Sequence, residues 1–397
     1  MGVRRLLYRD SYPMKILFVM HPNTALTYDT QIFMSDFVKN GFKVYFLSSF
    51  IGHQGPDRKI LPENENFLVY TIPNFYIEAF DRFIVYKVAR NFLVQALLLL
   101  KTAYLSFRHN IDVFITLGGF VESGFVPLIC SRMLNKPFIV RVVSDPSRDV
   151  YIRIKNTLIY RIYRKAEKKI LKEASRIITL DGVEEQYKNK TLVIPHKVDT
   201  QIFQRINING KYELYNLDKS DFILLYVGRI TEEKGVKILA ESFPAILEKV
   251  PNAKLLLVGK GNLENYVKRF VKTSGLENQI RLLGEKTRNE LSELYNVADV
   301  TILLSLVEGT PNPNVILESL ACDTPVITTR VGKIPGIVEN GKNGFIVDLE
   351  INNILNAVLK IPDLKEENLN KAIDDKNKRY DEGIKNLMEI IRKSNLQ

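Results

Sequence analysis

One stretch of the chain limits the possible folds most strongly, because it combines the signals of strand, loop, helix and strand in immediate succession. Residues 300–306 are mostly apolar and include β-branched side chains, which is typical of a buried parallel strand. Segment 308–313 holds one glycine and two prolines, so it cannot continue that strand. Asn314 is an acceptable N-cap for a helix over 315–321, and a second strand follows at 326–328. This order predicts an α/β domain with a parallel sheet.

Two carboxylates flank the loop of this stretch, Glu308 at its start and Glu318 in the helix that follows. A loop that leaves the carboxyl end of a parallel strand and opens a helix is where open α/β sheets bind ligands. The backbone N–H groups of such a helix start favour anions, whereas carboxylates suit the O–H donors of sugars and riboses. The stretch therefore predicts a nucleotide-sugar site, with phosphate on backbone amides and hydroxyl groups on the two carboxylates.

A second motif opens the same half of the chain at 222–235. An apolar strand ends at Val227, and Gly228 then lets the backbone approach a ligand closely. Two basic residues follow, Arg229 and Lys234. When a nucleoside diphosphate leaves a sugar its negative charge grows, and fixed cations aimed at it stabilise the transition state. Two solvated basic side chains at a helix start are the simpler alternative, but the agreement of two motifs favours a diphosphate site.

The overall composition is that of a globular protein with anionic partners. With 397 residues the chain is long enough for two domains, and 46% hydrophobic and 25% charged residues do not favour disorder. Two cysteines are too few for a disulfide framework or a zinc site. No apolar run reaches the roughly 18 residues of a membrane helix, and no secretory signal is recognised, so a cytoplasmic protein is expected. A net charge of +11 favours nucleotides, lipid head groups or nucleic acid as partners.

The first half of the chain opens with a Rossmann-like pattern of strand 14–20, helix 28–40 and strand 44–48. The loop after the first strand lacks glycines, which argues against a dinucleotide-binding fingerprint. Further along, Gly118 and Gly119 follow another short apolar strand. They form either a loop where the backbone approaches a ligand or a plain turn, and the sequence leaves both open.

Two helical patterns in the first half raise the question of a membrane surface. Segment 85–107 is amphipathic and is interpreted as a core helix, with a helix lying on a membrane as the alternative. Segment 151–174 carries eight lysines and arginines opposite an apolar stripe. It predicts either a solvated helix face or a docking element for the anionic inner face of the cell membrane.

The residues from Glu308 to Ile327 resemble the donor-site signature of retaining glycosyltransferases of family 4. That signature has two glutamates with seven residues between them, whereas nine separate Glu308 from Glu318, because Pro-Asn occurs twice; the strict spacing would reach Thr310. The resemblance implies the GT-B fold: two Rossmann-like domains that face each other across a cleft, and a C-terminal helix that crosses back to the first domain. It implies an acceptor domain at 14–203, a donor domain at 204–370 and the returning helix at 371–397, with a hinge at about 203–220.

The resemblance also implies roles for individual residues. Arg229 and Lys234 would hold the donor diphosphate, Glu308 the sugar hydroxyls and Glu318 the ribose. Asp145, at the end of strand 138–143, matches a Gly-Asp variant of the family with serine in place of glycine; an acceptor contact, a general base or a simple Asx-turn are all compatible with it. The implied catalytic residues are Arg229, Lys234, Glu308 and Asp145. The implied donor-binding residues are Gly228, Arg229, Lys234, Gly259, Gly284, Glu308, Gly309, Thr310, Pro311, Asn312, Asn314, Val315 and Glu318, and the acceptor-binding residues are Gly118, Gly119, Ser144 and Asp145.

These observations predict a retaining, metal-independent glycosyltransferase with no cofactor. It would move a sugar from a UDP- or GDP-sugar to a hydroxyl acceptor, with a lipid-linked molecule, a polysaccharide or another glycoconjugate as candidates. No metal is expected because Arg229 and Lys234 supply the positive charge and no Asp-x-Asp cluster lies near the site. The alternatives are a GT-B epimerase, a phosphorylase with a pyridoxal lysine, a catalytically degenerate partner of another transferase, and a basic nucleic-acid-binding protein. The last is disfavoured because zinc spacings and aromatic-interleaved basic strands are absent from the sequence.

Overall fold

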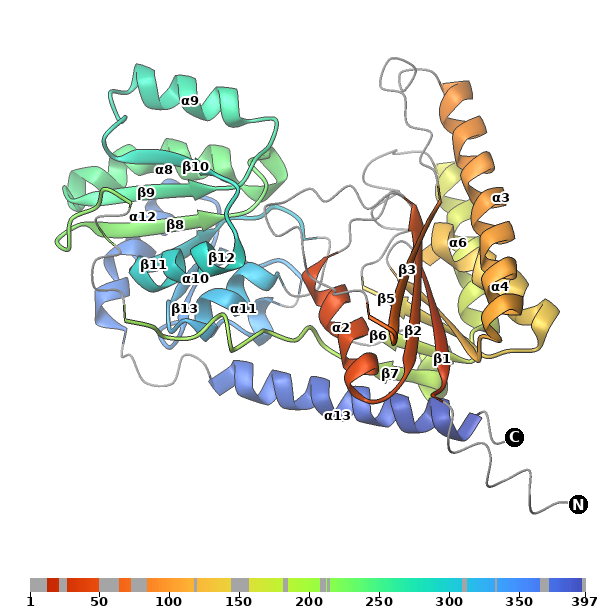
Figure 1. Cartoon of the computed structure of the whole chain (residues 1–397). Coiled ribbons are helices and arrows are strands. Elements are labelled where there is room, and N and C mark those ends of the chain that lie inside the picture. The colour runs from red at the N-terminus through yellow and green to blue at the C-terminus, as the bar shows by residue number, and fades with distance from the viewer. Residues whose placement is uncertain are drawn as a thin grey trace, which may run out of the picture. The chain divides into compact units, whose positions relative to one another are not determined.

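The chain folds into two compact units, each built on its own parallel sheet. The computed structural model describes residues 13–20, 27–49, 64–72, 84–117, 120–143, 157–180, 185–207, 212, 215–308, 313–332, 334–364 and 371–394. Unit 1 contains the described residues of 13–195 and 379–394, and unit 2 contains those of 196–378. The predicted fold class, α/β with two Rossmann-like domains, is confirmed (Figure 1).

Unit 1 is organised on a seven-stranded sheet in the order β3-β2-β1-β4-β5-β6-β7, with every pair of neighbours parallel. Its central strands are continuous apolar runs, as expected of strands that are covered on both faces. The strands are β1 (Lys15–Met20), β2 (Lys43–Ser49), β3 (Phe67–Ile72), β4 (Val113–Leu117), β5 (Phe138–Val142), β6 (Arg176–Thr179) and β7 (Thr191–Val193).

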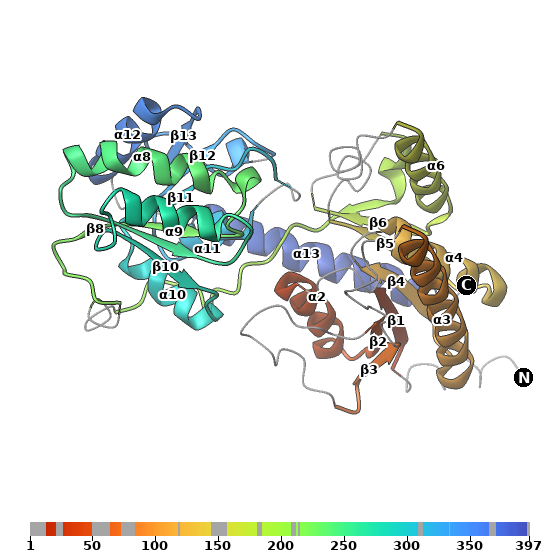
Figure 2. The same cartoon turned by 90° about the horizontal axis from the view of Figure 1, so that it is seen from above.

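Helices cover both faces of this sheet. One face packs against α2 (Tyr28–Lys39) and the C-terminal part of α13 (Lys371–Ser394), through aromatic and aliphatic side chains such as Phe37 and Leu387. The other face packs against α3 (Ile84–His109), α4 (Phe120–Leu134) and α6 (Thr157–Glu173). Figure 2 shows these three helices side by side, with α4 in contact with both of the others. They form one helical layer on unit 1.

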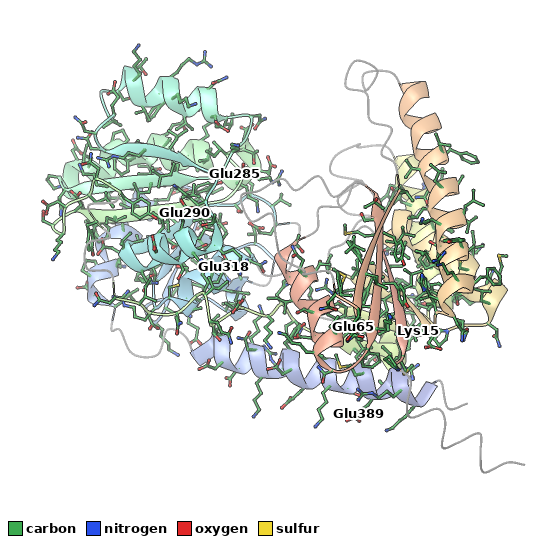
Figure 3. All side chains as sticks on the ribbon, viewed as in Figure 1. Lys15, Glu65, Glu285, Glu290, Glu318 and Glu389 are labelled. Carbon is green, nitrogen blue, oxygen red and sulfur yellow. The ribbon has the colours of Figure 1, made fainter. Side chains whose placement is uncertain are left out.

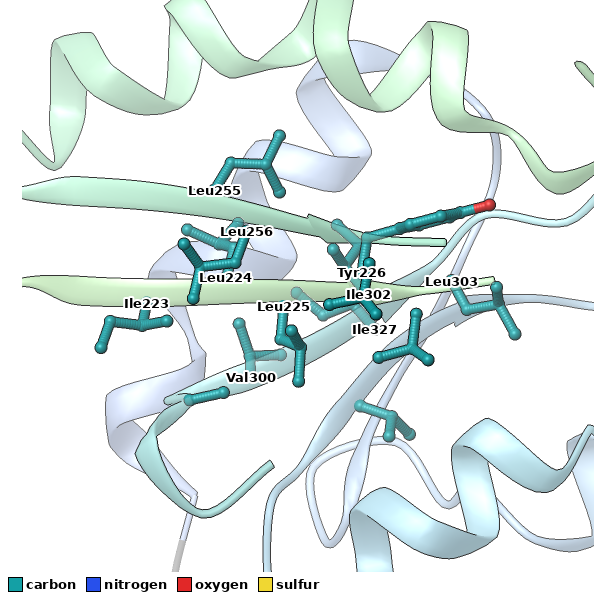
Figure 4. Close-up of a cluster of buried hydrophobic side chains, with 14 of the residues drawn as sticks. Ile223, Leu224, Leu225, Tyr226, Leu255, Leu256, Val300, Ile302, Leu303 and Ile327 are labelled. Carbon is teal, nitrogen blue, oxygen red and sulfur yellow. The ribbon is translucent and has the colours of Figure 1, made fainter. Parts of the chain in front are cut away.

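Unit 2 has a six-stranded parallel sheet in the order β10-β9-β8-β11-β12-β13. Figure 4 shows its core, where Leu224 and Tyr226 of β8 pack among apolar side chains of the neighbouring strands. The strands are β8 (Phe222–Val227), β9 (Ala253–Val258), β10 (Ile280–Gly284), β11 (Val300–Leu303), β12 (Val326–Thr329) and β13 (Gly344–Val347). The helices are α8 (Val236–Lys249), α9 (Glu264–Thr273), α10 (Arg288–Val297), α11 (Asn314–Ala321) and α12 (Ile351–Leu359), with short turns η3 (Glu232–Lys234), η4 (Ile334–Gly336) and η5 (Ile361–Asp363).

The strand order of unit 2 creates a switch point between β8 and β11. From β8 the chain moves outward through β9 to β10, and it then returns to place β11 on the other side of β8. Connections on the two sides of such a point diverge, which leaves space at the carboxyl ends of the strands where ligands of open α/β sheets bind. The segments that follow β8 and β11 contain the two motifs singled out in the sequence.

The last helix, α13, contributes side chains to both units. Within unit 2, Asn377 accepts a hydrogen bond from Val198 N and donates one to Val198 O, each at 2.9 Å. Within unit 1, the Tyr380 hydroxyl donates to an Asp36 carboxylate oxygen at 2.9 Å, and Arg392 donates to Asn40 O at 2.9 Å. In the described part of the chain, no helix combines the length and apolar character needed to cross a membrane.

Three local features differ from the sequence-based expectations. Strand β11 ends at Leu303 rather than 306, because Leu306 N donates to Glu233 O at 2.9 Å and draws the chain away from the sheet. Pro313, with φ −62° and ψ 129°, occupies the N-cap of α11, so Asn314 is the first helical residue and not the cap. Val198 and Phe203 are buried in the core of unit 2, so the segment 196–203 packs with the second unit and not the first.

Candidate functional site

Backbone hydrogen bonds join the loops at the carboxyl edge of the unit 2 sheet. Gly228 N donates to Val258 O at 3.0 Å, and Gly259 N donates to Gly284 O at 2.8 Å. Gly228 and Gly259, which follow β8 and β9, and Gly284, which ends β10, thus lie in one continuous ladder. The ladder continues where Ile230 N donates to Lys260 O at 2.9 Å. These hydrogen bonds tie the loops at the carboxyl edge of the sheet to one another.

Gly235 lies where the segment after β8 passes close to the segment after β11. Its φ of +70° lies in the left-handed region, and a Cβ at this position would stand 1.9 Å from Leu304 O. No side chain fits at that distance, so glycine is required on both counts. Gly235 separates the turn η3 from helix α8, and its contact with Leu304 brings Lys234 next to the loop that carries Glu308.

Lys234 and Glu308 meet directly across the switch point. Lys234 Nζ lies 2.7 Å from Glu308 Oε2, and their side chains are only 16% and 3% exposed. A charge-assisted hydrogen bond of this length, largely removed from water, is a strong and directional contact. Lys234 comes from one predicted motif and Glu308 from the other, and their side chains form a direct ion pair.

Only one of the two carboxylate oxygens of Glu308 has a hydrogen-bond partner among the described residues. Its second oxygen, Oε1, is buried and has no hydrogen-bond partner among the residues that the structure describes. A buried acceptor without a partner is costly, and the cost is removed when a donor binds there. Hydroxyl groups are suitable donors, because an ionised carboxylate only accepts.

Arg229 lies at the same edge but in a different environment. Its guanidinium is 62% exposed and pairs with Glu233 four residues later, at 3.1 Å. Its backbone is held more firmly, because the buried Tyr226 hydroxyl donates to Arg229 O at 2.6 Å. The loop is therefore fixed while the guanidinium stays accessible to an anion. An exposed ion pair of this kind contributes little to stability and is readily exchanged for another partner.

Glu318 lies on α11 and contacts side chains of α10. Figure 3 labels Glu318 on α11 and Glu290 on α10. The Tyr295 hydroxyl donates to Glu318 Oε2 at 3.2 Å, and Arg288 NH1 lies 3.7 Å from Oε1. Burial raises the pKa of the Glu318 carboxyl above its ordinary value, while Arg288 and the Tyr295 hydrogen bond oppose that rise. The glutamate is thus a buried acceptor with two fixed neighbours.

Arg288 and Tyr295 are functional candidates that the sequence reasoning missed. Arg288 is the first residue of α10 and lies within a capping box in which Thr287 and Glu290 satisfy each other's backbone N–H groups. Its guanidinium also stacks over the Phe203 ring at 4.7 Å. The Thr-x-x-Glu spacing at 287–290 was readable in the sequence and locates the helix start, but nothing in the sequence pairs Arg288 with a glutamate thirty residues later.

The remaining predicted residues divide into two groups. Asn314 is exposed and Val315 half-buried at the start of α11. Outside the described residues lie Gly309, Thr310, Pro311 and Asn312 of the donor loop and Gly118, Gly119, Ser144 and Asp145 of unit 1. Of the repeated Pro-Asn between the two glutamates, Pro311-Asn312 lies there, whereas Pro313 is the N-cap and Asn314 the first residue of α11. Over the described ranges, no group of three or more His, Cys, Asp or Glu side chains is placed to hold a metal ion.

Comparison with known proteins finds a family match that covers most of unit 2. Residues 213–381 match the family model described as glycosyl transferases group 1. An uncharacterized glycosyltransferase of Methanocaldococcus jannaschii is 28% identical over 228 residues, which is 55% of each chain. The UDP-Gal:alpha-D-GlcNAc-diphosphoundecaprenol alpha-1,3-galactosyltransferase of Escherichia coli is 28% identical over 258 residues, 62% of this chain and 65% of that one. The chain thus spans about half to two thirds of the length of these relatives.

A likeness to solved structures extends over nearly the whole chain. The Anabaena protein HepE, solved in complex with UDP, matches with a TM-score of 0.70 over 96% of this chain and 100% of that chain. The two sequences are 18% identical, so the likeness concerns the fold.

Proposed function

We propose that the protein is a retaining glycosyltransferase, because residues 213–381 match the family model of glycosyl transferases group 1. It transfers a sugar from a nucleoside-diphosphate sugar to a hydroxyl acceptor. The observation that carries this proposal is the meeting of Lys234 and Glu308 at the switch point of unit 2, where a cation and a half-satisfied carboxylate lie together. The cation suits the diphosphate, and the open Glu308 oxygen suits a sugar hydroxyl.

In this proposal each described residue has a distinct task. Lys234 and Arg229 stabilise the negative charge that grows on the diphosphate as it departs. Glu308 Oε1 accepts a hydroxyl of the donor sugar, and Glu318 accepts the ribose hydroxyls. The bond between the anomeric carbon and the diphosphate oxygen breaks, and the bond to the acceptor oxygen forms on the same face. The acceptor's proton passes to the departing phosphate oxygen, so no metal or cofactor is required.

The acceptor in this proposal is a lipid-linked hydroxyl. Support comes from the Escherichia coli relative, whose name gives a diphosphoundecaprenol-linked acceptor, and from the Anabaena structure that holds UDP. It also comes from the net charge of +11 and from helix α6, whose outer side is basic. Such a helix would bring unit 1 to the anionic inner face of the cell membrane from the cytoplasmic side.

The test is a thermal-shift screen of the full chain against UDP-, GDP- and ADP-sugars, followed by assays of sugar release and transfer. A ligand at about a hundredfold over its Kd adds roughly 2.7 kcal/mol to the free energy of unfolding, an easily measured shift. Lys234→Ala is expected to remove the shift. Its control is Lys254→Ala, because Lys254 is also a partly buried lysine paired with a carboxylate, at 4.0 Å from Asp221, but it lies at the amino end of β9.

Two results would count against the proposal. If no nucleotide sugar shifts the wild type, or if both lysine variants respond alike, the donor site is not where Lys234 and Glu308 meet. If a donor binds at this site but no sugar is ever released to water or to an acceptor, the protein is a degenerate relative that acts as a partner of another transferase.

A further inference from the structure

The outward side of the α3–α4 layer on unit 1 exposes large apolar side chains. On α3, Phe92 is 80% exposed, Leu100 67% and Phe107 70%, and on α4 Met133 is 69% exposed. Tyr104 on α3 and Ile129 on α4 are exposed on the same two helices. Single exposed apolar residues are ordinary, but a group on adjacent helices marks a surface that binds something apolar.

The spacing of these residues places them on one side of α3. Positions 92, 100, 104 and 107 are separated by eight, four and three residues, which keeps them on one face of an α-helix. The opposite side of α3 packs against the sheet of unit 1, where Val94, Leu98 and Leu105 are buried. Over residues 92–107, α3 is therefore apolar on both sides, and among the residues that the structure describes only its inner side is covered.

The exposed charged side chains described around this apolar face are positive. Exposed lysines and arginines border it, most of them on α6, beside α4. Among the described side chains of α3, α4 and α6 the acidic ones are Glu167, which is buried and paired with Arg164, and Glu173, which is paired with Arg132; the side chain of Glu122 in α4 lies outside the described ones. The exposed basic residues are Arg108, Arg132, Arg161, Lys165, Lys168, Lys169 and Lys172.

We propose that the outer face of α3 and α4, with the basic side of α6, is a membrane-binding surface that inserts into an anionic lipid bilayer. Helix α3 lies in the plane of the interface with its outer aromatic and aliphatic side chains among the acyl chains. The lysines of α6 contact the lipid phosphates, where each contributes to attraction within a Debye length of the surface. The sequence suggested α6 for this contact and left a membrane-lying helix at 85–107 as an alternative, and the structure shows which side chains of α3 are exposed.

Charge argues for a bilayer rather than a second copy of the chain. A symmetric contact between two copies would bring the same basic surface of each close to the other, and like charges facing one another oppose association. An anionic bilayer is complementary in charge and accepts apolar side chains at the same time. This inference deepens the proposed function, because it names the surface that brings unit 1 to a lipid-linked acceptor.

The experiment is co-sedimentation of the full chain with two kinds of vesicle, phosphatidylcholine alone and an equimolar mixture with phosphatidylglycerol. Three variants are compared with the wild type. The first removes apolar anchors (F92S/L100S/F107S), the second removes charge (K165Q/K168Q/K169Q), and the third is a control that removes exposed apolar residues of α12 in unit 2 (I351S/L359S). All the changed side chains are exposed, so each variant is expected to melt like the wild type.

The wild type and the control variant are expected to bind the anionic vesicles equally. The apolar variant should show a partition coefficient at least about tenfold lower, since three large apolar side chains no longer leave water. The charge variant should lose the preference for phosphatidylglycerol. Donor-induced thermal shifts should be the same in all four proteins, so a failure of membrane binding is distinguishable from a failure of the donor site.

Three outcomes would overturn the inference. One is a wild type that does not bind anionic vesicles. Another is an apolar variant that binds them as well as the control variant does. The third is a wild type that is dimeric in gel filtration and becomes monomeric in the apolar variant without any change in vesicle binding, which would assign the face to a second copy of the chain.

Discussion

Lys234 and Glu308 are 74 residues apart in sequence, yet their side chains meet at 2.7 Å because they follow β8 and β11, which are neighbours in the sheet. Both side chains are largely buried, and the second Glu308 oxygen has no partner among the described residues. The pair is therefore part of the packing of unit 2 as well as part of the candidate site. Its removal should have consequences for stability that an exposed pair would not have.

The first prediction is that Lys234→Met lowers the free energy of unfolding by about 3 kcal/mol, because it leaves a carboxylate buried without its cation. Glu308→Gln on the same background should recover part of that loss, since a neutral amide no longer needs a counter-charge. Urea denaturation of both single variants and the double variant measures the coupling. The matched comparison is Arg229→Ala, which breaks an exposed pair and should cost less than about 1 kcal/mol. Equal losses for Lys234→Met and Arg229→Ala would contradict this account.

The second prediction concerns pH and Glu318. Burial raises the pKa of this carboxyl above the ordinary 4.5, so between that pH and its folded pKa the folded state binds more protons than the unfolded state. The free energy of unfolding then falls as pH rises through this window, by about 1.4 kcal/mol for each unit of the rise. Glu318→Gln removes this term, so its stability relative to the wild type should increase from pH 4 to pH 7. Parallel stability curves for the two proteins would show that the Glu318 pKa is not raised.

The sequence predicted the strands that lead into the site, because an apolar run is a local feature. An apolar run followed by Gly228 marks β8, and the structure adds that Gly228 and Gly259 lie at one edge of the sheet. The contacts that shape the site are not local. Leu306 N donates a hydrogen bond to Glu233 O, and β11 is shorter than expected as a result. Neither sequence segment contains a pattern that predicts this hydrogen bond.

The same limit applies to the surroundings of Glu318. The apolar spacing of the sequence predicts that Glu318 lies in a helix. Its partners Tyr295 and Arg288 lie on another helix, α10, and they become neighbours of Glu318 only in the folded unit, where the strand order determines the positions of α10 and α11. The capping box beginning at Thr287 was the one available signal. Likewise, the periodicity of α3 predicted a buried face, whereas the exposed face became evident only with the neighbouring helices in place.

The third prediction is that Arg288 positions Glu318 without touching the donor. Arg288→Met removes a positive charge 3.7 Å from Glu318, so the pKa of that carboxyl should rise further. The acid limb of kcat/KM should move to higher pH and the KM for the donor should increase. Arg288→Lys restores the charge but not the stacking over Phe203, and should recover part of both. A uniform loss of activity with no displacement of the acid limb would indicate a purely structural role.

The fourth prediction separates backbone conformation from close approach at Gly235. Gly235 and Gly275 both have left-handed φ, +70° and +65°, but an added Cβ would stand 1.9 Å from Leu304 O at Gly235 and meets nothing within 4 Å at Gly275. Gly275→Ala should therefore cost only the conformational term, about 1 kcal/mol. Gly235→Ala must also push η3 away from the chain after β11, which separates Lys234 from Glu308. It should lose clearly more stability in urea denaturation and should bind the donor more weakly, whereas Gly275→Ala should bind it normally. If the two alanine variants were equally stable and bound the donor equally, the contact between Gly235 and Leu304 would have no part in forming the site.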